Sequence, residues 1–360
     1  MKKRVTIDDV AREAGVSRQT VSRAINGKHD ISADTRARVL ESIDLLGYRP
    51  SRIAQGMASS QTRTIGLIIS DVTNPSHAEI VRGLQDKAQS HNYNVFIRNT
   101  DRDIAIEREA IESLISEDVD GLVIMTSMLS YEELGKIAER FRPIVLIHRQ
   151  HDHPNISSLL INLERASDLA LSYLIGSGHR NIGLITSHGD LANCRHIIAY
   201  KEVLTQRGIT IGKDWIVQGD TSLAGGYVAT RQLLTKHPEI TAIFAYNDIM
   251  AIGAISACRQ LGRSVPHDCS VMGFNDIMLA SYVNPTLSTI RYFTNFVGYC
   301  ALERVLEMID NAGGAFPPVV LECELVIRES TASVQIEGKK STVAGDSVAS
   351  TSAQRRRKYG

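Results

Sequence analysis

Residues 5–27 read VTIDDVAREAGVSRQTVSRAING, and this stretch decides how the N-terminal part of the chain folds. Four apolar residues have the spacing of one helix face: Ile7, Val10, Ala11 and Ala14. Thr6 precedes two acidic residues, as an N-cap precedes the acids of a first helical turn. Gly15 ends this helix, and Ser17 caps a second one. Two short helices joined by a glycine-containing turn predict a helix-turn-helix.

The second helix of this motif carries side chains that can read DNA. In a helix-turn-helix, the first residues of the second helix meet base edges in the major groove. Here they include Arg18 and Gln19, and arginine pairs with guanine as glutamine pairs with adenine. Residues 1–60 hold 11 Lys/Arg and 7 Asp/Glu, so this basic end suits phosphate contact while the chain as a whole is neutral. The alternative is a plain three-helix domain with solvated arginines.

Four motifs in the first 50 residues resemble the DNA-binding headpiece of the lactose/galactose repressor (LacI/GalR) family. They are Thr6–Ala11, Ala14–Ser17, Thr20–Arg23 and Gly47–Pro50. The resemblance continues to about residue 330 and implies a sequence-specific transcription regulator, expected to be a repressor. It also implies a homodimer on a pseudopalindromic double-stranded DNA operator, because the twofold symmetry of such proteins is mirrored in the half-sites.

The resemblance places the DNA-binding domain at residues 1–49 and a hinge helix or linker at 50–61. Within the first domain, Ile31–Thr35 is expected to start a third helix, with an inner side formed by Ala37, Val39, Leu40, Ile43 and Leu46. In the hinge, Met57 matches a leucine that wedges into the minor groove, although a plain linker is the alternative. The residues expected to contact DNA are Thr6, Ser17, Arg18, Gln19, Thr20, Ser22, Arg23, Asn26, Tyr48, Arg52 and Met57.

From Thr64 onward, short apolar runs alternate with longer amphipathic segments. The apolar runs are residues 65–70, 95–99, 121–126, 144–148, 159–162, 182–186, 242–246 and 270–274. Strand–helix alternation with buried strands predicts parallel α/β sheets. Such sheets bind ligands at the carboxyl ends of their strands, so the residues that follow each run are candidates for a binding site.

For this body, the family resemblance implies an effector-binding and dimerisation domain at residues 62–335. The expected fold is thus an all-α helix-turn-helix headpiece plus an α/β type I periplasmic-binding-protein-like body of two lobes. One lobe combines residues 62–160 with 291–320, and the other combines 161–290 with 321–332. The chain is expected to cross between them near Asn162, Thr289–Tyr292 and Pro317–Leu321. Residues 336–360 are rich in Ser, Thr, Ala and basic residues, which predicts a disordered tail.

Composition favours a cytoplasmic protein. Of the 360 residues, 43% are hydrophobic and 22% are charged, ordinary values for a globular chain of two or three domains. No apolar run reaches the roughly 18 residues that a membrane span needs, and the opening MKKR leads into a polar helix rather than a signal segment. The five cysteines show no Cys-x-x-Cys spacing and are typical of reduced residues.

The sequence lacks the motifs of an enzyme. It has no Gly-x-Ser-x-Gly elbow, no His-Glu-x-x-His, no phosphate loop and no Gly-x-Gly-x-x-Gly fingerprint. Residues 148–153, HRQHDH, have metal-capable side chains, but nothing in the sequence fixes their convergence on one point. We therefore expect no catalytic residues, no metal and no cofactor. A ligand-binding protein or enzyme without a DNA-dependent function remains the rival class.

The resemblance implies a small, carbohydrate-type effector. The chain has His148, Asn162 and Asn275 where aspartates are usual in the family, and it has histidines at His77 and His196. Lost acceptor charges and added donors favour a sugar acid or a phosphosugar. A neutral sugar, a nucleoside or a pocket without ligand response stay open. The expected effector-binding residues are Asp71, Ser76, His77, His148, Asn162, Arg195, His196, Thr221, Asn247, Asp248, Asn275 and Tyr292.

Overall fold

The structure, a computed structural model, describes residues 5–25, 30–49, 61–187 and 191–334. Several predictions from the sequence lie outside these residues: the hinge at 50–60 with Arg52 and Met57, the tail at 336–360, and Asn26. No helix in the described ranges is long and apolar enough to cross a membrane.

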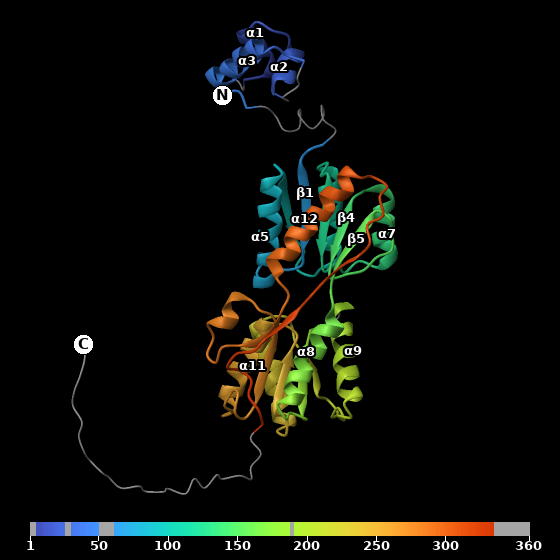
Figure 1. The fold of residues 1–360 in the computed structure, drawn as a ribbon, viewed down its shortest axis with the longest axis vertical. Helices are drawn as coiled ribbons and strands as arrows, with labels where there is room; N and C mark the ends of the chain where they lie inside the picture. The colour runs from blue at the N-terminus through green and yellow to red at the C-terminus, as the bar shows by residue number, and fades with distance from the viewer. Residues whose placement is uncertain (1–4, 26–29, 50–60, 188–190, 335–360) are drawn as a thin grey trace, which may run out of the picture.

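The headpiece consists of three helices, α1 (Ile7–Ala14), α2 (Arg18–Ile25) and α3 (Ala33–Leu46), shown in blue in Figure 1. The Thr6 backbone N–H and hydroxyl both donate to the Asp9 carboxylate, 2.9 and 2.7 Å away, which fixes the start of α1. Gly15 ends α1 with φ 65°, a left-handed conformation that glycine adopts without strain. The buried core of the headpiece is Val10, Ala11, Ala14, Val21, Ala24 and Val39.

The predicted inner side of α3 was partly wrong. Ala37 and Leu40 are exposed, and 47% of Leu40 is accessible to solvent. The helix instead turns Val39, Ser42, Ile43 and Leu46 towards the core, a set with i, i+3, i+4, i+7 spacing. Burial of Ser42 leaves no hydroxyl group unpaired, because the hydroxyl donates to the Arg38 carbonyl at 2.9 Å. An apolar count alone therefore gave the wrong phase of the helix.

The first lobe of the body, lobe 1, contains one parallel six-stranded sheet in the order β11-β5-β4-β3-β1-β2. Its strands are β1 (Thr64–Ile69), β2 (Asn94–Asn99), β3 (Gly121–Met125), β4 (Ile144–Ile147), β5 (Ile156–Ile161) and β11 (Val319–Leu321). Its helices are α5 (Pro75–Ser90), α6 (Ile104–Ser116), α7 (Tyr131–Arg140) and α12 (Thr294–Asp310). Every residue of β1, β3, β4 and β5 is buried, as expected for parallel strands covered on both faces.

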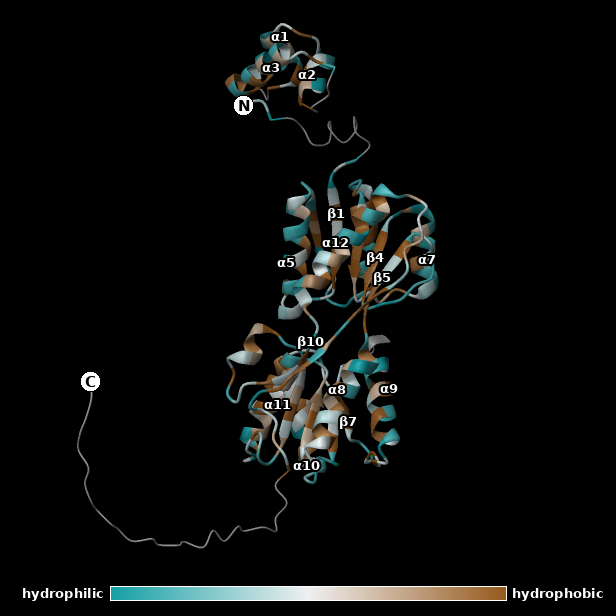
Figure 2. Cartoon of the chain, viewed as in Figure 1, coloured by the Kyte–Doolittle hydropathy of each residue, from teal (hydrophilic) through white to brown (hydrophobic). Residues whose placement is uncertain are grey.

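Lobe 2 contains a second six-stranded sheet in the order β12-β10-β9-β8-β6-β7. Its strands are β6 (Ile182–Thr186), β7 (Ile216–Gln218), β8 (Ala242–Ala245), β9 (Ser270–Asn275), β10 (Ser288–Arg291) and β12 (Glu324–Val326). Its helices are α8 (Leu163–Gly176), α9 (Leu191–Gln206), α10 (Leu223–Lys236), α11 (Asp248–Gln260) and the 3-10 helix η1 (Met278–Ser281). This sheet is mixed rather than parallel, because β12 runs antiparallel to β10. Figure 2 shows hydrophobic strands inside both lobes and polar residues on the outward faces of the helices.

The chain passes between the lobes three times, in the narrow middle of the body in Figure 1. The first two passages lie at Asn162, between β5 and α8, and at Tyr292–Phe293, between β10 and α12. The third lies at Glu322–Cys323, later than the predicted Pro317–Leu321. The reason is that residues 319–321 pair with β5 as the edge strand of lobe 1 before the chain crosses.

Close helix contacts through glycine hold each lobe together. In lobe 1, a Cβ atom on Gly83 of α5 would collide with the Asn295 carbonyl, and one on Gly298 of α12 would collide with the Ile80 carbonyl. In lobe 2, the glycines Gly226 and Gly253 bring α10 and α11 equally close. Any larger side chain at these positions would push the helices apart, because packed interiors have no spare volume.

Candidate functional site

The exposed side of α2 is the first candidate site. Val21 and Ala24 face the headpiece core, so the helix turns Arg18 and Gln19 outward. Ser22 is half-buried, and Arg23 is exposed and forms an ion pair with Asp30 at 3.2 Å. The predicted DNA-reading side chains of α2 therefore share one accessible surface.

Other predicted DNA contacts lie at helix ends and at the edge of the headpiece core. Thr6 caps α1, and the Ser17 hydroxyl accepts the Thr20 backbone N–H at 3.1 Å before α2 begins. Tyr48 packs against the headpiece core, and its N–H donates to the Ile43 carbonyl at 3.0 Å. Backbone N–H groups at helix N-termini are favourable positions for phosphate oxygens.

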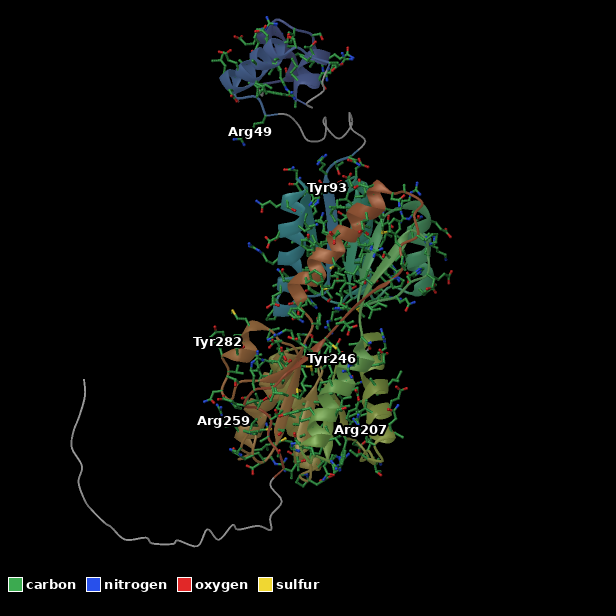
Figure 3. All side chains as sticks on the ribbon, in the orientation of Figure 1. Arg49, Tyr93, Arg207, Tyr246, Arg259 and Tyr282 are labelled. Carbon is green, nitrogen blue, oxygen red and sulfur yellow. The ribbon has the colours of Figure 1, made fainter. Side chains whose placement is uncertain are left out.

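The second candidate site is a cavity between the lobes, which encloses about 650 Å³ when the solvent-filled space at its opening is included. Residues at the carboxyl ends of both sheets form its wall, the position at which parallel α/β sheets bind ligands. Lobe 1 contributes Asn74, Ser76, His77, Arg102, Thr126, His148 and Ile161. Lobe 2 and the second passage contribute Leu163, Arg195, His196, Tyr246, Asn247, Phe274, Asn275 and Tyr292. Figure 3 shows Tyr246 at the end of lobe 2 that faces lobe 1.

The structure brings most of the predicted effector residues to this wall. Those that line it are Ser76, His77, His148, Arg195, His196, Asn247, Asn275 and Tyr292. The prediction missed Asn74, Arg102, Thr126, Ile161, Leu163, Tyr246 and Phe274. Thr126, Ile161, Tyr246 and Phe274 lie at or within one residue of a strand end, so the rule that located the site could have found these four. Arg102 is harder to find, because it lies in the loop between β2 and α6.

Three predicted effector residues hold the framework instead of lining the cavity. The Asp71 carboxylate accepts the Thr73 N–H at 2.8 Å and shapes the loop after β1. The Asn162 side chain caps α8 by accepting the Arg165 N–H at 2.9 Å. Thr221 supports the wall through its carbonyl, which accepts from the Asn247 side chain at 3.4 Å.

Asp248 is the fourth predicted effector residue that does not line the cavity. It is fully buried, and its carboxylate accepts from the Ile277 N–H at 2.8 Å and from the Thr289 hydroxyl at 2.5 Å. Burial raises the pKa of Asp248 to about 7. Its side chain joins the loop after β9 to β10, next to Asn247, which does line the cavity.

Among the described residues, three histidines line the cavity: His77 and His148 from lobe 1 and His196 from lobe 2, of which His148 is half-buried and the other two are buried. His148 follows β4, and burial lowers its pKa to about 3. His196 lies on α9 with the rings of Phe274 and Tyr246 centred 5.0 and 5.2 Å away, and burial lowers its pKa to about 4. The third, His77, has its Nδ1 2.8 Å from the Asp71 carbonyl oxygen, and burial lowers its pKa as well. These imidazoles are therefore neutral in the ligand-free protein at pH 7.

Permanent positive charge in the cavity wall comes from two arginines. Arg102 belongs to lobe 1 and Arg195 to lobe 2, where Arg195 pairs with Glu164 at 3.0 Å. No lining residue in the described part of the chain is acidic. The run HRQHDH at 148–153 is divided between environments, since His148 lines the cavity while His151 stacks on Tyr131 with ring centres 3.8 Å apart.

Strained backbone marks the same wall. Thr126, His148 and Asn275 have φ angles of 55°, 66° and 118°, a region that side-chain-bearing residues rarely occupy. Such strain persists only where surrounding contacts enforce it, and it gathers at functional sites. Next to Asn275, the Asp276 carboxylate accepts from Arg291 and Arg328, each at 2.6 Å, and these ion pairs hold the loop in place.

Comparison with known proteins matches both parts of the chain. Residues 6–51 match the bacterial regulatory proteins of the lacI family, and residues 171–331 match the periplasmic binding protein-like domain. Catabolite control protein A of Priestia megaterium is 34% identical over 329 residues, which are 91% of this chain and 99% of that relative. The ribose operon repressor of Haemophilus influenzae is 34% identical over 331 residues, 92% and 99% of the two chains.

Solved structures agree with these sequence matches. The lac repressor dimer bound to operator and the anti-inducer ONPF has a TM-score of 0.84 to this fold at 28% identity, covering 92% of this chain and 100% of that one. A CelR–cellobiose complex has a TM-score of 0.69 at 28% identity, covering 91% and 100%.

The buried histidines predict a loss of stability in acid. Unfolded histidines bind protons near pH 6.5, whereas folded His148 and His196 do not, so the stability present above that pH is lost as the pH falls towards 4. At pH 5, protonation of each histidine in the unfolded chain should lower the free energy of unfolding by about 2 kcal/mol. Urea unfolding of His148→Gln at pH 5, 6 and 7 should show a shallower pH dependence than the parent. The control His267→Gln, an exposed position, should keep the parental slope, and equal slopes in all three proteins would contradict the assignment.

Proposed function

Because the chain belongs to the LacI family of bacterial regulatory proteins, and is thus a DNA-binding transcriptional repressor controlled by an effector rather than an enzyme, we propose how it recognises each partner. Helix α2 reads the operator as part of a homodimer in the cytoplasm, where bacterial DNA lies. The cavity between the lobes binds a small, carbohydrate-derived anion. The observation that carries the second proposal is the cavity wall, with an arginine from each lobe and no acidic residue among the described lining positions.

In the DNA complex, Arg18 and Gln19 contact base edges, because they are the exposed residues in the first turn of α2. Arg23 exchanges its ion pair with Asp30 for a contact with DNA. Thr6, Ser17, Thr20, Ser22 and Tyr48 position the headpiece on the phosphates. Asn26, Arg52 and the minor-groove wedge Met57 complete the contacts from outside the described residues.

Removing a base-reading side chain should weaken operator binding. We expect Arg18→Ala and Gln19→Ala each to cost roughly 1–3 kcal/mol of binding free energy and to relax the base preference at one position of each half-site. Fluorescence anisotropy at fixed salt, on operators selected from a random duplex library, measures both effects. Arg38→Ala, an exposed arginine on α3, is the matched control and should bind like the parent. Parental affinity and preference in both α2 variants would refute the recognition role.

Exposed apolar side chains on the body support the homodimer. On η1 and just after it, Met278, Leu279 and Tyr282 are 69%, 42% and 79% exposed, and Tyr282 projects from the flank of lobe 2 in Figure 3. On lobe 1, the edge strand β2 exposes Phe96 and Ile97. Apolar groups clustered on a surface mark sites of protein association, and we assign these two to the dimer interface.

A charge placed in this interface should separate the protomers. Tyr282→Asp removes a large aromatic contact and buries a carboxylate, so we expect the dimer dissociation constant to rise at least about 100-fold. Sedimentation velocity across micromolar concentrations measures the dissociation constant. Ile198→Asp is the control, since this α9 residue is also exposed, by 53%, on a different helix. Unchanged dimerisation of Tyr282→Asp would exclude this surface.

A sugar acid or phosphosugar suits the cavity for electrostatic reasons. An anion between Arg102 and Arg195 would contact both lobes, and charge-assisted bonds to guanidinium groups are stronger than bonds between neutral groups. The ring of Tyr292 lies 5.8 Å from that of Phe274, and together they offer apolar faces for the C–H groups of a carbohydrate.

A neutral sugar or nucleoside is the second candidate, and the neutral state of the histidines favours it. Uncharged imidazoles can exchange hydrogen bonds with hydroxyl groups, so the positive charge expected from His148 and His196 is absent from the ligand-free cavity. The net charge of the true effector therefore decides between the two candidates.

Thermal shifts on the whole protein test the anionic class. Sugar acids and phosphosugars should raise the melting temperature in a dose-dependent way, since ligand at 100 times its dissociation constant stabilises by about 2.7 kcal/mol. Arg102→Gln and Arg195→Gln should lose most of this response. Arg259→Gln is the control, because Figure 3 places Arg259 on the outer flank of lobe 2. Shifts with neutral sugars or nucleosides alone would reject the anionic class and support the second candidate.

A further inference from the structure

Five of the described basic side chains line the cavity wall, and we call this set the basic arc: Arg102, His77, His148, His196 and Arg195. Neighbours along the arc interact electrostatically. Arg102 acts on His77, which acts on His148, and His196 acts on His148 from the other lobe. Arg195 in turn acts on His196. The arc therefore runs from one arginine to the other across the gap between the lobes.

Two ring nitrogens in the middle of the arc lack hydrogen-bond partners. His148 Nε2 and His196 Nδ1 are both buried, and neither meets a donor or acceptor in the described part of the chain. Buried polar atoms are nearly always paired, because an unpaired one costs the desolvation of the group without return. One unpaired nitrogen comes from each lobe and both side chains line the cavity, so a single ligand between the lobes can satisfy both.

The surroundings of these imidazoles contain little negative charge to hold a proton. The charges of His77 on α5 and His196 on α9 act on His148, and the ring of Tyr292 packs edge-on against it. Arg149 follows it in the chain. His196 contacts the ring of Tyr246 and interacts with the charge of Arg195, and the acid that acts on it, Glu164 on α8, is already paired with Arg195. Asp71 interacts with His77 at the other end of the arc. An incoming anion is therefore the missing counter-charge.

We propose that an anionic ligand completes the basic arc and that its binding draws a proton from solvent onto His148 Nε2, His196 Nδ1 or both, so that effector binding is coupled to pH. An oxyanion at hydrogen-bond distance accepts from each N–H that forms, and it replaces the stabilisation that burial removed from the charged imidazole. One lobe is then joined to the other by a charge-assisted contact. This inference rests on the anionic effector class proposed above.

Coupled proton uptake has a measurable sign. Where one proton is taken up, the affinity should rise about tenfold for each unit by which the pH falls. Gluconate and glucitol form a matched pair of probes, because gluconate has a carboxylate where glucitol has a hydroxymethyl group. Gluconate stays ionised above pH 5, so its own charge does not change over the tested range. We expect gluconate to bind the whole protein more tightly at pH 6 than at pH 8 and glucitol to show no such trend. His148→Gln and His196→Gln should flatten the dependence, and His267→Gln, an exposed control, should keep it.

Imidazole NMR of the whole protein supplies a readout that does not require the natural effector. With histidine labelled by ¹⁵N, His148 and His196 should stay neutral from pH 8 to pH 6 in chloride and become protonated in that range when sulfate is added to about 100 mM. Histidines that are already charged without an anion, or that stay neutral with gluconate or sulfate, would overturn the proposal. Glucitol binding without gluconate binding would overturn the anionic class as well. Operator binding, measured separately without ligand, tests the repressor function independently of both.

Discussion

The contact between α5 and α12 is the constraint on which the body depends. Gly83 and Gly298 let the two helix backbones meet. Helix α12 therefore packs in lobe 1, although it comes directly after β10 of lobe 2 in the chain. At the other end of this contact, Lys87 donates to the Tyr299 hydroxyl at 2.8 Å and to Glu303 at 3.1 Å. The start of α12 is thereby fixed, and with it Tyr292, which lies in the second passage between the lobes and in the cavity wall.

A second set of contacts fixes the wall from the side of lobe 2. Asp276 binds Arg291 at the end of β10 and Arg328 beyond β12, and Arg291 also pairs with Glu324 at 2.7 Å. These ion pairs join the loop after β9 to β10, the strand before the second passage, and to β12, the strand after the third passage. A change in the loop at Asn275 is thus felt at the points where the lobes are connected, which is the physical requirement for a ligand in the cavity to alter the relative arrangement of the lobes.

The alternation of apolar runs with amphipathic segments was sufficient to predict the α/β body, because most residues of the buried parallel strands are apolar. It did not predict the three-residue strands β7, β11 and β12, which lie at sheet edges, nor the interior strand β10, whose sequence Ser-Thr-Ile-Arg has one aliphatic residue. In the cavity, the strand-end rule located the wall, but it could not separate Asp248 from a ligand contact, since only the fold shows that Ile277 and Thr289 occupy its carboxylate. Nor could sequence give the charge of His148 and His196, which depends on burial.

The order of the chain has a consequence for synthesis on the ribosome. The headpiece core is complete within the first 50 residues, so a DNA-reading unit can fold as soon as that segment emerges. Neither lobe can be completed so early, because lobe 1 needs α12 and β11 and lobe 2 needs β12, all encoded after residue 293. At about 5–20 residues per second, tens of seconds separate the two events. A nascent or prematurely terminated chain therefore carries an operator-recognition surface before any sensor exists to govern it.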